Sequence, residues 1–371
     1  MKYIYLLNEY KKQDIYEKLG IKNAFLSSAN KLSLPIPPSF SITTDACNQY
    51  YKDEETLNSE LLEQINEYII KLEKITGKKF GSTKNPLLLS IKSSSRNTIP
   101  NILESIQNIG LTESIVENLS KDTNNFIWIW ECYLELIKNY SKIIMGTELE
   151  CYKNIKDILE NNTQLNIEEL RNLSDKLKKE YKLKNKTDFP DNSLEQLHSV
   201  IKATYKSWDN KKANIYRNDT NIPFTDGISI NIQSMVFGNL NKNSGTGTLY
   251  TRDPITGDKV LIGNFIPQSL NYPTTPNENN LLKYTSLYTN FPEICTQLEN
   301  IIPLLETHYK DMLKIDFVIE DKKLFITQIE RGKRTAPAAL KIACDFYVEQ
   351  SINNSSEETP YIKVKKTNKN D

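Results

Sequence analysis

The sequence ISINIQSMVFGNLNKNSGTGTLYTRDPITGDKVLIGNF, residues 228–265, carries the strongest fold signal in the chain. Its first residues alternate apolar and polar side chains, with isoleucine at positions 228, 230 and 232. This period of two is typical of a strand with one buried face. Gly245-Thr246-Gly247 predicts a turn, and further strands are expected at 249–251 and 259–265. The stretch is therefore predicted to form a three-stranded antiparallel meander.

Strand patterns also lie near both ends of the chain, whereas the middle is helical. The predicted strands are 3–7, 40–43, 87–91, 315–319 and 323–327. Between 115 and 213 the apolar spacing is almost entirely that of helices, one of them at 153–160, and a last helix is expected at 335–349. The tail from Asn353 is polar. This arrangement predicts an α+β protein whose sheet-forming parts are separated by a helical insert.

The composition argues against several classes of function. Lys+Arg and Asp+Glu both number 47, so no net charge steers the chain toward nucleic acid or an anionic membrane. The five cysteines are scattered without a CxxC pair, which favours a reducing compartment over disulfides or a zinc site. No segment reaches the roughly 20 apolar residues of a membrane helix, and the apolar run at 3–7 is too short for a signal peptide. A cytoplasmic protein without nucleic-acid or membrane partners is expected.

Five blocks of sequence, in order along the chain, carry a family resemblance. They are LPIPPSFSITT at 34–44, IKSSSR at 91–96, IQNIGL at 106–111, the stretch at 228–265 and QIERGKRTAPAA at 328–339. Together they resemble the N-terminal nucleotide-binding domain of pyruvate, phosphate dikinase, and the resemblance runs from Lys2 to about Val348. It implies an ATP-grasp-like fold, in which two α+β lobes clasp ATP and a helical subdomain lies between them. The implied parts are an N-terminal lobe at 1–111, a helical subdomain at 112–196, a C-terminal lobe at 197–348 and a polar tail at 349–371.

The resemblance also implies a set of site residues for ATP and Mg²⁺. In the family, phosphoryl groups of ATP pass to a histidine on a separate swivelling domain. This chemistry needs cations on the phosphates and oxygen ligands on the metal. Lys22 and Arg96 match catalytic positions, and Asp316 and Gln328 match metal ligands. The implied ATP-binding residues are Lys22, Lys92, Arg96, Gln233, Met235 and Val236, of which the last three match the adenine side.

The phosphate-binding loops depart from the family pattern. The segment GIKNAF at 20–25 keeps the lysine of the family's glycine loop but has lost two glycines, which weakens close approach of the backbone to phosphate. Lys92 stands where the family has arginine, so the charge is kept and the bidentate fork is lost. The next family loop aligns with 99–105 and has lost its glycine, and a further family segment is replaced at 267–272.

Charges around the metal position have also changed. Lys314 stands where the family has one of two carboxylates, and the other is shortened to Asp316. On the next strand Glu330 stands for a family arginine, and an arginine of the helical subdomain aligns with Glu135. The neighbouring Arg331 is expected on the opposite face of its strand unless the strand bulges. Charge reversal beside a phosphate is expected to cost several kcal/mol.

Three interpretations remain open. The first is a kinase half that binds MgATP and phosphorylates a histidine on a separate polypeptide. It needs an external acceptor because neither His198 nor His308 lies in an acceptor-like motif, and the chain ends where the family's phosphohistidine domain would begin. The second is a degenerate ATP-grasp pseudoenzyme acting as a binding or regulatory module, which the lost arginines, carboxylate and glycines favour. The third is a decaying fragment of a split gene.

Overall fold

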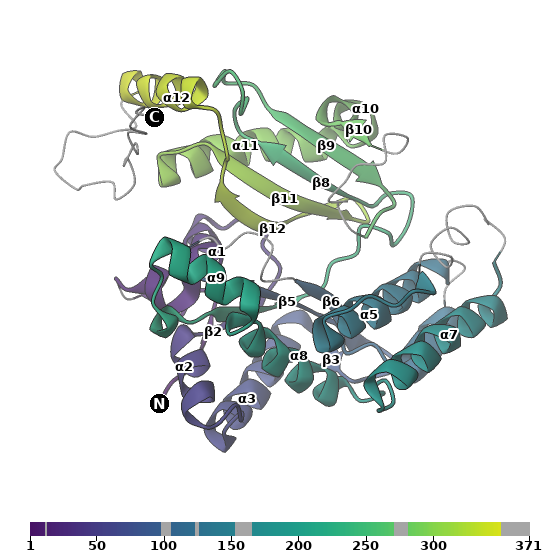
Figure 1. Cartoon of the computed structure of the whole chain (residues 1–371). Helices are drawn as coiled ribbons and strands as arrows, with labels where there is room; N and C mark the ends of the chain where they lie inside the picture. Colours follow the sequence, from purple (N-terminus) through teal and green to yellow (C-terminus); the bar gives the residue numbers. More distant parts are fainter. Residues whose placement is uncertain (12, 98–104, 123–125, 153–164, 271–280, 350–371) are drawn as a thin grey trace, which may run out of the picture.

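Two five-stranded sheets, antiparallel throughout, form the framework of the chain (Figure 1). The computed structural model describes residues 1–11, 13–97, 105–122, 126–152, 165–270 and 281–349. The first sheet has the order β1 (Ile4–Leu6), β2 (Ser39–Ile42), β7 (Ser229–Ser234), β5 (Leu89–Ser94) and β6 (Ile106–Ile109). The second has the order β10 (Leu282–Lys283), β9 (Ile262–Pro267), β8 (Gly245–Tyr250), β11 (Leu313–Glu320) and β12 (Lys323–Arg331). A short parallel pair, β3 (Lys79–Phe80) and β4 (Pro86–Leu87), accompanies them, and the predicted α+β class is confirmed.

β7 is the first strand predicted in the 228–265 stretch, but the predicted meander is wrong. β7 lies between β2 and β5 in the first sheet, whereas β8 and β9 pair with each other in the second. All six residues of β7 are buried, because its polar face is covered by α1 (Ile15–Ala29). Asn23 of α1 donates to the Ser229 hydroxyl at 3.0 Å, and that hydroxyl donates to the Leu19 carbonyl. The alternation of residues therefore predicted the strand, but a period of two does not select its partners.

Two glycines predicted in a turn lie inside β8 instead. A Cβ atom on Gly245 would lie 2.2 Å from the ring of Phe265, and one on Gly247 would lie 2.3 Å from the ring of Phe317. These two rings are stacked, with centroids 6.4 Å apart. The glycines therefore serve the close packing of two aromatic rings against the strand.

The predicted helical middle of the chain is confirmed where the structure describes it. Its helices are α4 (Glu113–Asp122), α5 (Ile127–Met145), α7 (Ile167–Asn185), α8 (Ser193–Trp208) and α9 (Lys211–Thr220). Asn166, Asn192 and Asn210 cap the last three helices by accepting from backbone N–H groups of the first turn. The predicted helix at 153–160 and the tail from 353 lie outside the described residues. None of the helices in the described part of the chain is long and apolar enough to cross a lipid bilayer.

The remaining helices cover the sheets and join them. They are α1, α2 (Thr44–Lys52), α3 (Ser59–Thr76), α10 (Leu287–Asn290), α11 (Pro292–Tyr309) and α12 (Ala336–Val348). In Figure 1, α1 lies between the two sheets. Its Asn23 bonds to β7, whereas Phe25 belongs to the core of the second sheet and stacks on Tyr309 of α11 at 4.4 Å. The predicted division at 111 and 196 stays a prediction, and β7, from the third predicted part, completes the first sheet.

A buried arginine holds the last helix against the second sheet. Arg252 follows β8, and its side chain is fully buried. Its Nε and Nη2 atoms donate to the two carboxylate oxygens of Glu306 in α11, both at 3.0 Å. Its guanidinium lies 4.3 Å from the Phe346 ring of α12 and pairs with Asp345 at 3.3 Å. Charge pairing and stacking together therefore fix α11, α12 and the end of β8.

Candidate functional site

Gly20 brings the Lys22 loop against the end of β5. The residue interrupts α1 with φ 70° and ψ 169°, a region open essentially to glycine alone. A Cβ atom there would lie 2.5–2.7 Å from atoms of Ser94 and Ser95. The backbone N–H groups of the next two residues donate hydrogen bonds across this short distance. Ile21 donates to the Ser95 carbonyl at 2.9 Å, and Lys22 donates to the Ser94 hydroxyl at 3.0 Å. One glycine of the family loop thus still fixes the backbone at Lys22.

Lys92 reaches from the first sheet to the second. Its Nζ donates to the Thr327 carbonyl of β12 at 2.9 Å and lies 3.5 Å from the Gln233 side-chain oxygen of β7. Burial lowers the pKa of Lys92 to about 8, the charge of Asp316 opposes that shift, and the charge of Lys22 adds to it. Lys92, Lys22, Gln233 and Asp316 therefore gather at one seam between the sheets.

A bulge in β12 presents the carbonyl that Lys92 uses. Asp316 of β11 is opposite Gln328, whereas Phe317 is opposite Ile326, so Thr327 is the extra residue of the bulge. The Thr327 hydroxyl donates to the backbone oxygen of Asp316 at 3.2 Å. The two predicted metal ligands, Asp316 and Gln328, are thus brought opposite each other next to Lys92.

Asp316 already pairs with other side chains of its own sheet. Lys314 lies with its Nζ 3.4 Å from Asp316 Oδ1 and 3.1 Å from Glu330 Oε1. The Thr248 hydroxyl of β8 donates to the same Asp316 oxygen at 2.7 Å. Burial of Lys314 disfavours its charge, but the attraction of Asp316 and Glu330 prevails and raises its pKa. Lys314 stands where the family has a carboxylate and Glu330 where it has an arginine, and these two residues therefore pair with each other.

This donor set does not fit Mg²⁺ as it stands. Magnesium demands oxygen ligands at about 2.0–2.1 Å in near-octahedral geometry. The facing oxygens of Asp316 and Glu330 are instead held by the ammonium of Lys314. Within the described ranges no three His, Cys, Asp or Glu side chains gather in a way that could hold a metal ion.

The predicted adenine-side residues lie where the chain leaves β7 for the second sheet. Gln233 is buried, and its amide donates to the Pro37 carbonyl at 3.4 Å. Met235 is buried and donates its N–H to the Leu88 carbonyl at 2.8 Å, whereas Val236 is half-buried. Gln233 lies next to Lys92, so this segment and the lysine seam are continuous.

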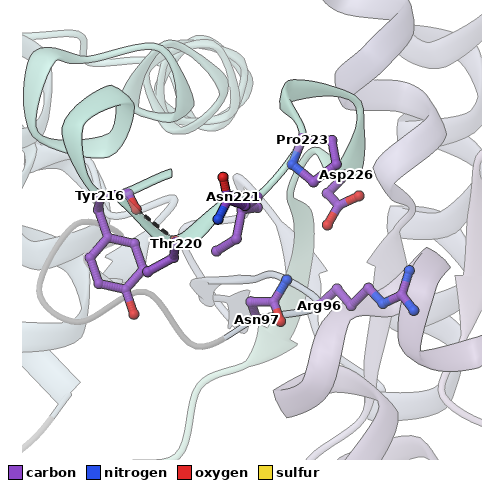
Figure 2. A pocket seen from close by; sticks show the side chains of 8 residues that line it. Arg96, Asn97, Tyr216, Thr220, Asn221, Pro223 and Asp226 are labelled. Atoms are coloured by element: carbon purple, nitrogen blue, oxygen red, sulfur yellow. Dashed lines mark hydrogen bonds between the residues drawn. The ribbon is translucent and has the colours of Figure 1, made fainter. Parts of the chain in front are cut away.

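Arg96 contacts a different group of residues from Lys92. Its side chain is about half exposed and pairs with Glu17 at 3.3 Å. It also lines a polar cavity of about 520 Å³, shown in Figure 2, with Asn221, Pro223 and Asp226 facing Arg96 and Asn97. Neither the ion pair nor the lining of this cavity includes Lys92 or Lys22, so Arg96 lies outside the seam. Most of the predicted loop at 99–105, which follows Arg96, lies outside the described residues, as does the end of the replaced segment at 267–272.

Two further charged positions are engaged locally. Glu135 of α5 accepts from Lys138 at 3.2 Å, from Asn139 at 3.1 Å and from the Tyr152 hydroxyl, so neighbouring helical residues balance its charge. Arg331 is opposite Leu313, beyond the bulge, and its Nε lies 3.8 Å from Asp311. As predicted, Arg331 does not take the place that Glu330 occupies.

The contacts that the sequence alone did not predict are those between residues that differ from the family pattern. Lys314 and Glu330 are directly opposite in the register, and Asp316 and Gln328 are the next pair on that face. Pairing the two strands of the predicted hairpin before comparing charges would have revealed the Lys314–Glu330 pair. Thr248 and the Thr327 carbonyl leave no comparable signal in the sequence.

Two antiparallel sheets, joined along a seam of lysines and interrupted by a block of helices, define an ATP-grasp-like α+β domain. The chain belongs to the family described as "Pyruvate phosphate dikinase, AMP/ATP-binding domain", which matches residues 16–265. It is 36% identical over 353 residues to pyruvate, phosphate dikinase of Clostridium symbiosum, covering 93% of this chain and 40% of that protein. Identity is 35% to the protein of that name in Rhizobium meliloti (strain 1021), covering 91% and 40%, and 31% to the chloroplastic one of Flaveria trinervia, covering 92% and 36%. The chain thus spans about 40% of the length of these relatives.

Proposed function

We propose that the seam between the two sheets binds ATP. The single observation that carries this proposal is the position of Lys92, whose ammonium projects from β5 of the first sheet to the β12 bulge of the second. A nucleotide held there would contact both sheets at once. The family membership of the chain supports the choice of an adenine nucleotide.

The two ends of the nucleotide would meet different chemistry. Lys92 and Lys22 supply positive charge for the phosphates, and the Lys22 backbone is held by Gly20 at the end of β5. Gln233, Met235 and Val236 supply a buried amide and apolar surface for adenine. Arg96 pairs with Glu17 instead, so we assign it no contact with the nucleotide.

The activity proposed for such a domain depends on the metal position. A kinase half would hold Mg²⁺ at Asp316 and Gln328 and phosphorylate a histidine on a separate polypeptide. The contacts of Lys314 favour the second candidate, a module that binds nucleotide for a binding or regulatory purpose. Incubation with ATP and a phosphohistidine domain from a dikinase relative separates the two, since only the kinase half forms phosphohistidine.

Calorimetric titration with ATP tests the nucleotide site itself. Replacing Lys92 with Met removes a charge-assisted contact of about 1.5–3 kcal/mol, so affinity should fall by about 10- to 150-fold. Lys84→Met is the matched control, because Lys84 is an exposed lysine of the loop before β4 and should keep the affinity of the unaltered protein. Equal affinity in both variants, or no binding at millimolar ATP, would overturn the proposal.

A further inference from the structure

We infer that Lys314 is the built-in cation of this site, and that the site takes the nucleotide's polyphosphate without a divalent metal. This inference rests on the proposed nucleotide site and specifies the form of ligand that it accepts. It concerns free ATP, with its full negative charge, rather than the magnesium complex.

The strand register places the groups on one face of the second sheet. Lys314 and Asp316 are two residues apart on β11 and therefore point to the same side. Opposite them on β12 are Glu330 and Gln328, and Thr248 of β8 lies on the other side of Asp316. The ammonium of Lys314 lies 3.1 Å from Glu330 and 3.4 Å from Asp316, where it can donate to both carboxylates.

Each carboxylate of this group is matched by its own cation or donor. Asp316 Oδ1 faces Lys314 and accepts from Thr248, and Glu330 Oε1 accepts from Lys314. Farther along β11, Glu320 accepts the N–H of Phe237 at 2.6 Å and has Lys323 opposite it in the register. Among the described residues, the acidic side chains on this face of β11 and β12 are therefore engaged before any ligand arrives.

The charge sum around the seam favours an uncomplexed anion. Asp316 and Glu330 contribute two formal negative charges, against the formal positive charges of Lys314, Lys22 and Lys92. A divalent ion would have to approach the ammonium of Lys314 or displace it from both carboxylates. Polyphosphate, by contrast, is attracted by the lysines. The Lys314 side chain is 27% exposed, so it is partly open to solvent.

Calorimetry with ATP in EDTA and in excess Mg²⁺ tests this inference. The unaltered protein should bind free ATP at least as tightly as MgATP. Lys314→Asp replaces the ammonium by a third carboxylate, so this variant should bind ATP about tenfold or more tightly in excess Mg²⁺ than in EDTA. Lys323→Asp, the same charge change at the far end of the hairpin, should keep the metal independence of the unaltered protein.

Manganese provides a readout that is independent of nucleotide. Electron paramagnetic resonance should detect no bound Mn²⁺ in the unaltered protein, but should detect it in Lys314→Asp. Thermal unfolding of each variant verifies that the fold is retained. Tight binding of MgATP with little binding of free ATP would overturn the inference and leave the nucleotide site intact. Failure of the unaltered protein to bind either form would overturn the proposed function and the inference together.

Discussion

Lys92 shows how one side chain links the two sheets electrostatically. It is half-buried, bonds to the bulge of β12 and lies within the field of both Lys22 and Asp316. A lysine at such a position can lose its proton far more readily than an exposed one. Its protonation state therefore changes the positive charge of the seam.

Nucleotide affinity is expected to fall as the pH rises above about 8. The pKa of Lys92 is lowered from 10.5 to about 8, so the unliganded protein loses this charge in the range where ATP stays fully ionised. Bound phosphate favours the charged form, so binding takes up a proton there, and the dissociation constant should rise by up to about tenfold per pH unit. Titrations at pH 7, 8 and 9 check this.

Lys92→Arg is the control for the pH dependence, because arginine keeps its charge throughout this range. Its affinity should change little between pH 7 and 9. Parallel pH profiles for Lys92→Arg and the unaltered protein would show that another group controls the binding.

The role of the predicted site residues stays a prediction, but part of their clustering could be anticipated from the sequence. Gln233, Asp316 and Gln328 do lie at the seam with Lys92. The relation between Lys314 and Glu330 could not be predicted in this way, because each substitution alone indicates a loss and only the strand register shows that the charges meet. Arg96 faces a separate cavity, since a loop residue's direction is not determined by its place in a motif.

At the level of elements, α1 is shaped by a single glycine. Gly20 interrupts the helix, so that Gly20 and the two residues after it lie against Ser94 and Ser95, while Phe25 farther along packs into the core of the second sheet. Two positive-φ glycines elsewhere, Gly77 and Gly146, end helices where an added Cβ atom would meet nothing within 4 Å. Replacing Gly77 or Gly146 therefore tests backbone strain alone, whereas replacing Gly20 tests strain together with a steric clash.

Gly20→Ala should destabilise the protein more than Gly146→Ala. Both variants place alanine at positive φ, which costs about 1–2 kcal/mol in the left-handed region. Gly20 additionally has a ψ that is essentially restricted to glycine, and its Cβ would clash with the backbone of Ser95 at 2.7 Å. Urea unfolding measures the difference, and calorimetry should show weaker ATP binding for Gly20→Ala alone. Equal losses of stability would mean that the contact with β5 relaxes without penalty.

Loss of Arg252, which holds α12 against the second sheet, should also destabilise the protein. Arg252→Met leaves the buried carboxylate of Glu306 without its partner, so the free energy of unfolding should fall by about 3–5 kcal/mol. Arg171→Met, at a much more exposed pair with Glu117, should lower it by about 1 kcal/mol or less. Urea unfolding at pH 7 checks both.

A double variant identifies the cause of the Arg252 effect. Replacing Glu306 with Leu in the Arg252→Met background removes the stranded charge and should restore much of the lost stability. No recovery would assign the loss to packing against Phe346 rather than to charge.

Most individual elements could be predicted from periodicity, but their arrangement could not. The hairpin of β11 and β12, the helices capped by asparagine and the β7 strand follow from local patterns. The partners of β7 are 135 or more residues away in sequence, as the bond from Ser229 to Ser94 illustrates, and no local rule selects them. The glycines of β8 predict a turn in isolation, because the aromatic rings that require them lie on other strands.

At the scale of the whole molecule, helix α1, Lys92 and the segment that runs from β7 to β8 are among the connections between the two sheets. Along this segment Phe237 bonds to Glu320 of β11, and Asn239 donates to Glu131 of α5 at 3.0 Å. The segment between β7 and β8 therefore contacts both the second sheet and the helical block.

The central claim is that this seam binds ATP with the ammonium of Lys314 in place of a divalent metal. Crystals grown with ATP and Mn²⁺, measured at the manganese absorption edge, test it directly. The expected map shows the triphosphate beside Lys22, Lys92 and Lys314 and no anomalous peak between Asp316 and Gln328. An anomalous peak bound by Asp316 and Gln328, with Lys314 turned away from Glu330, would contradict the claim.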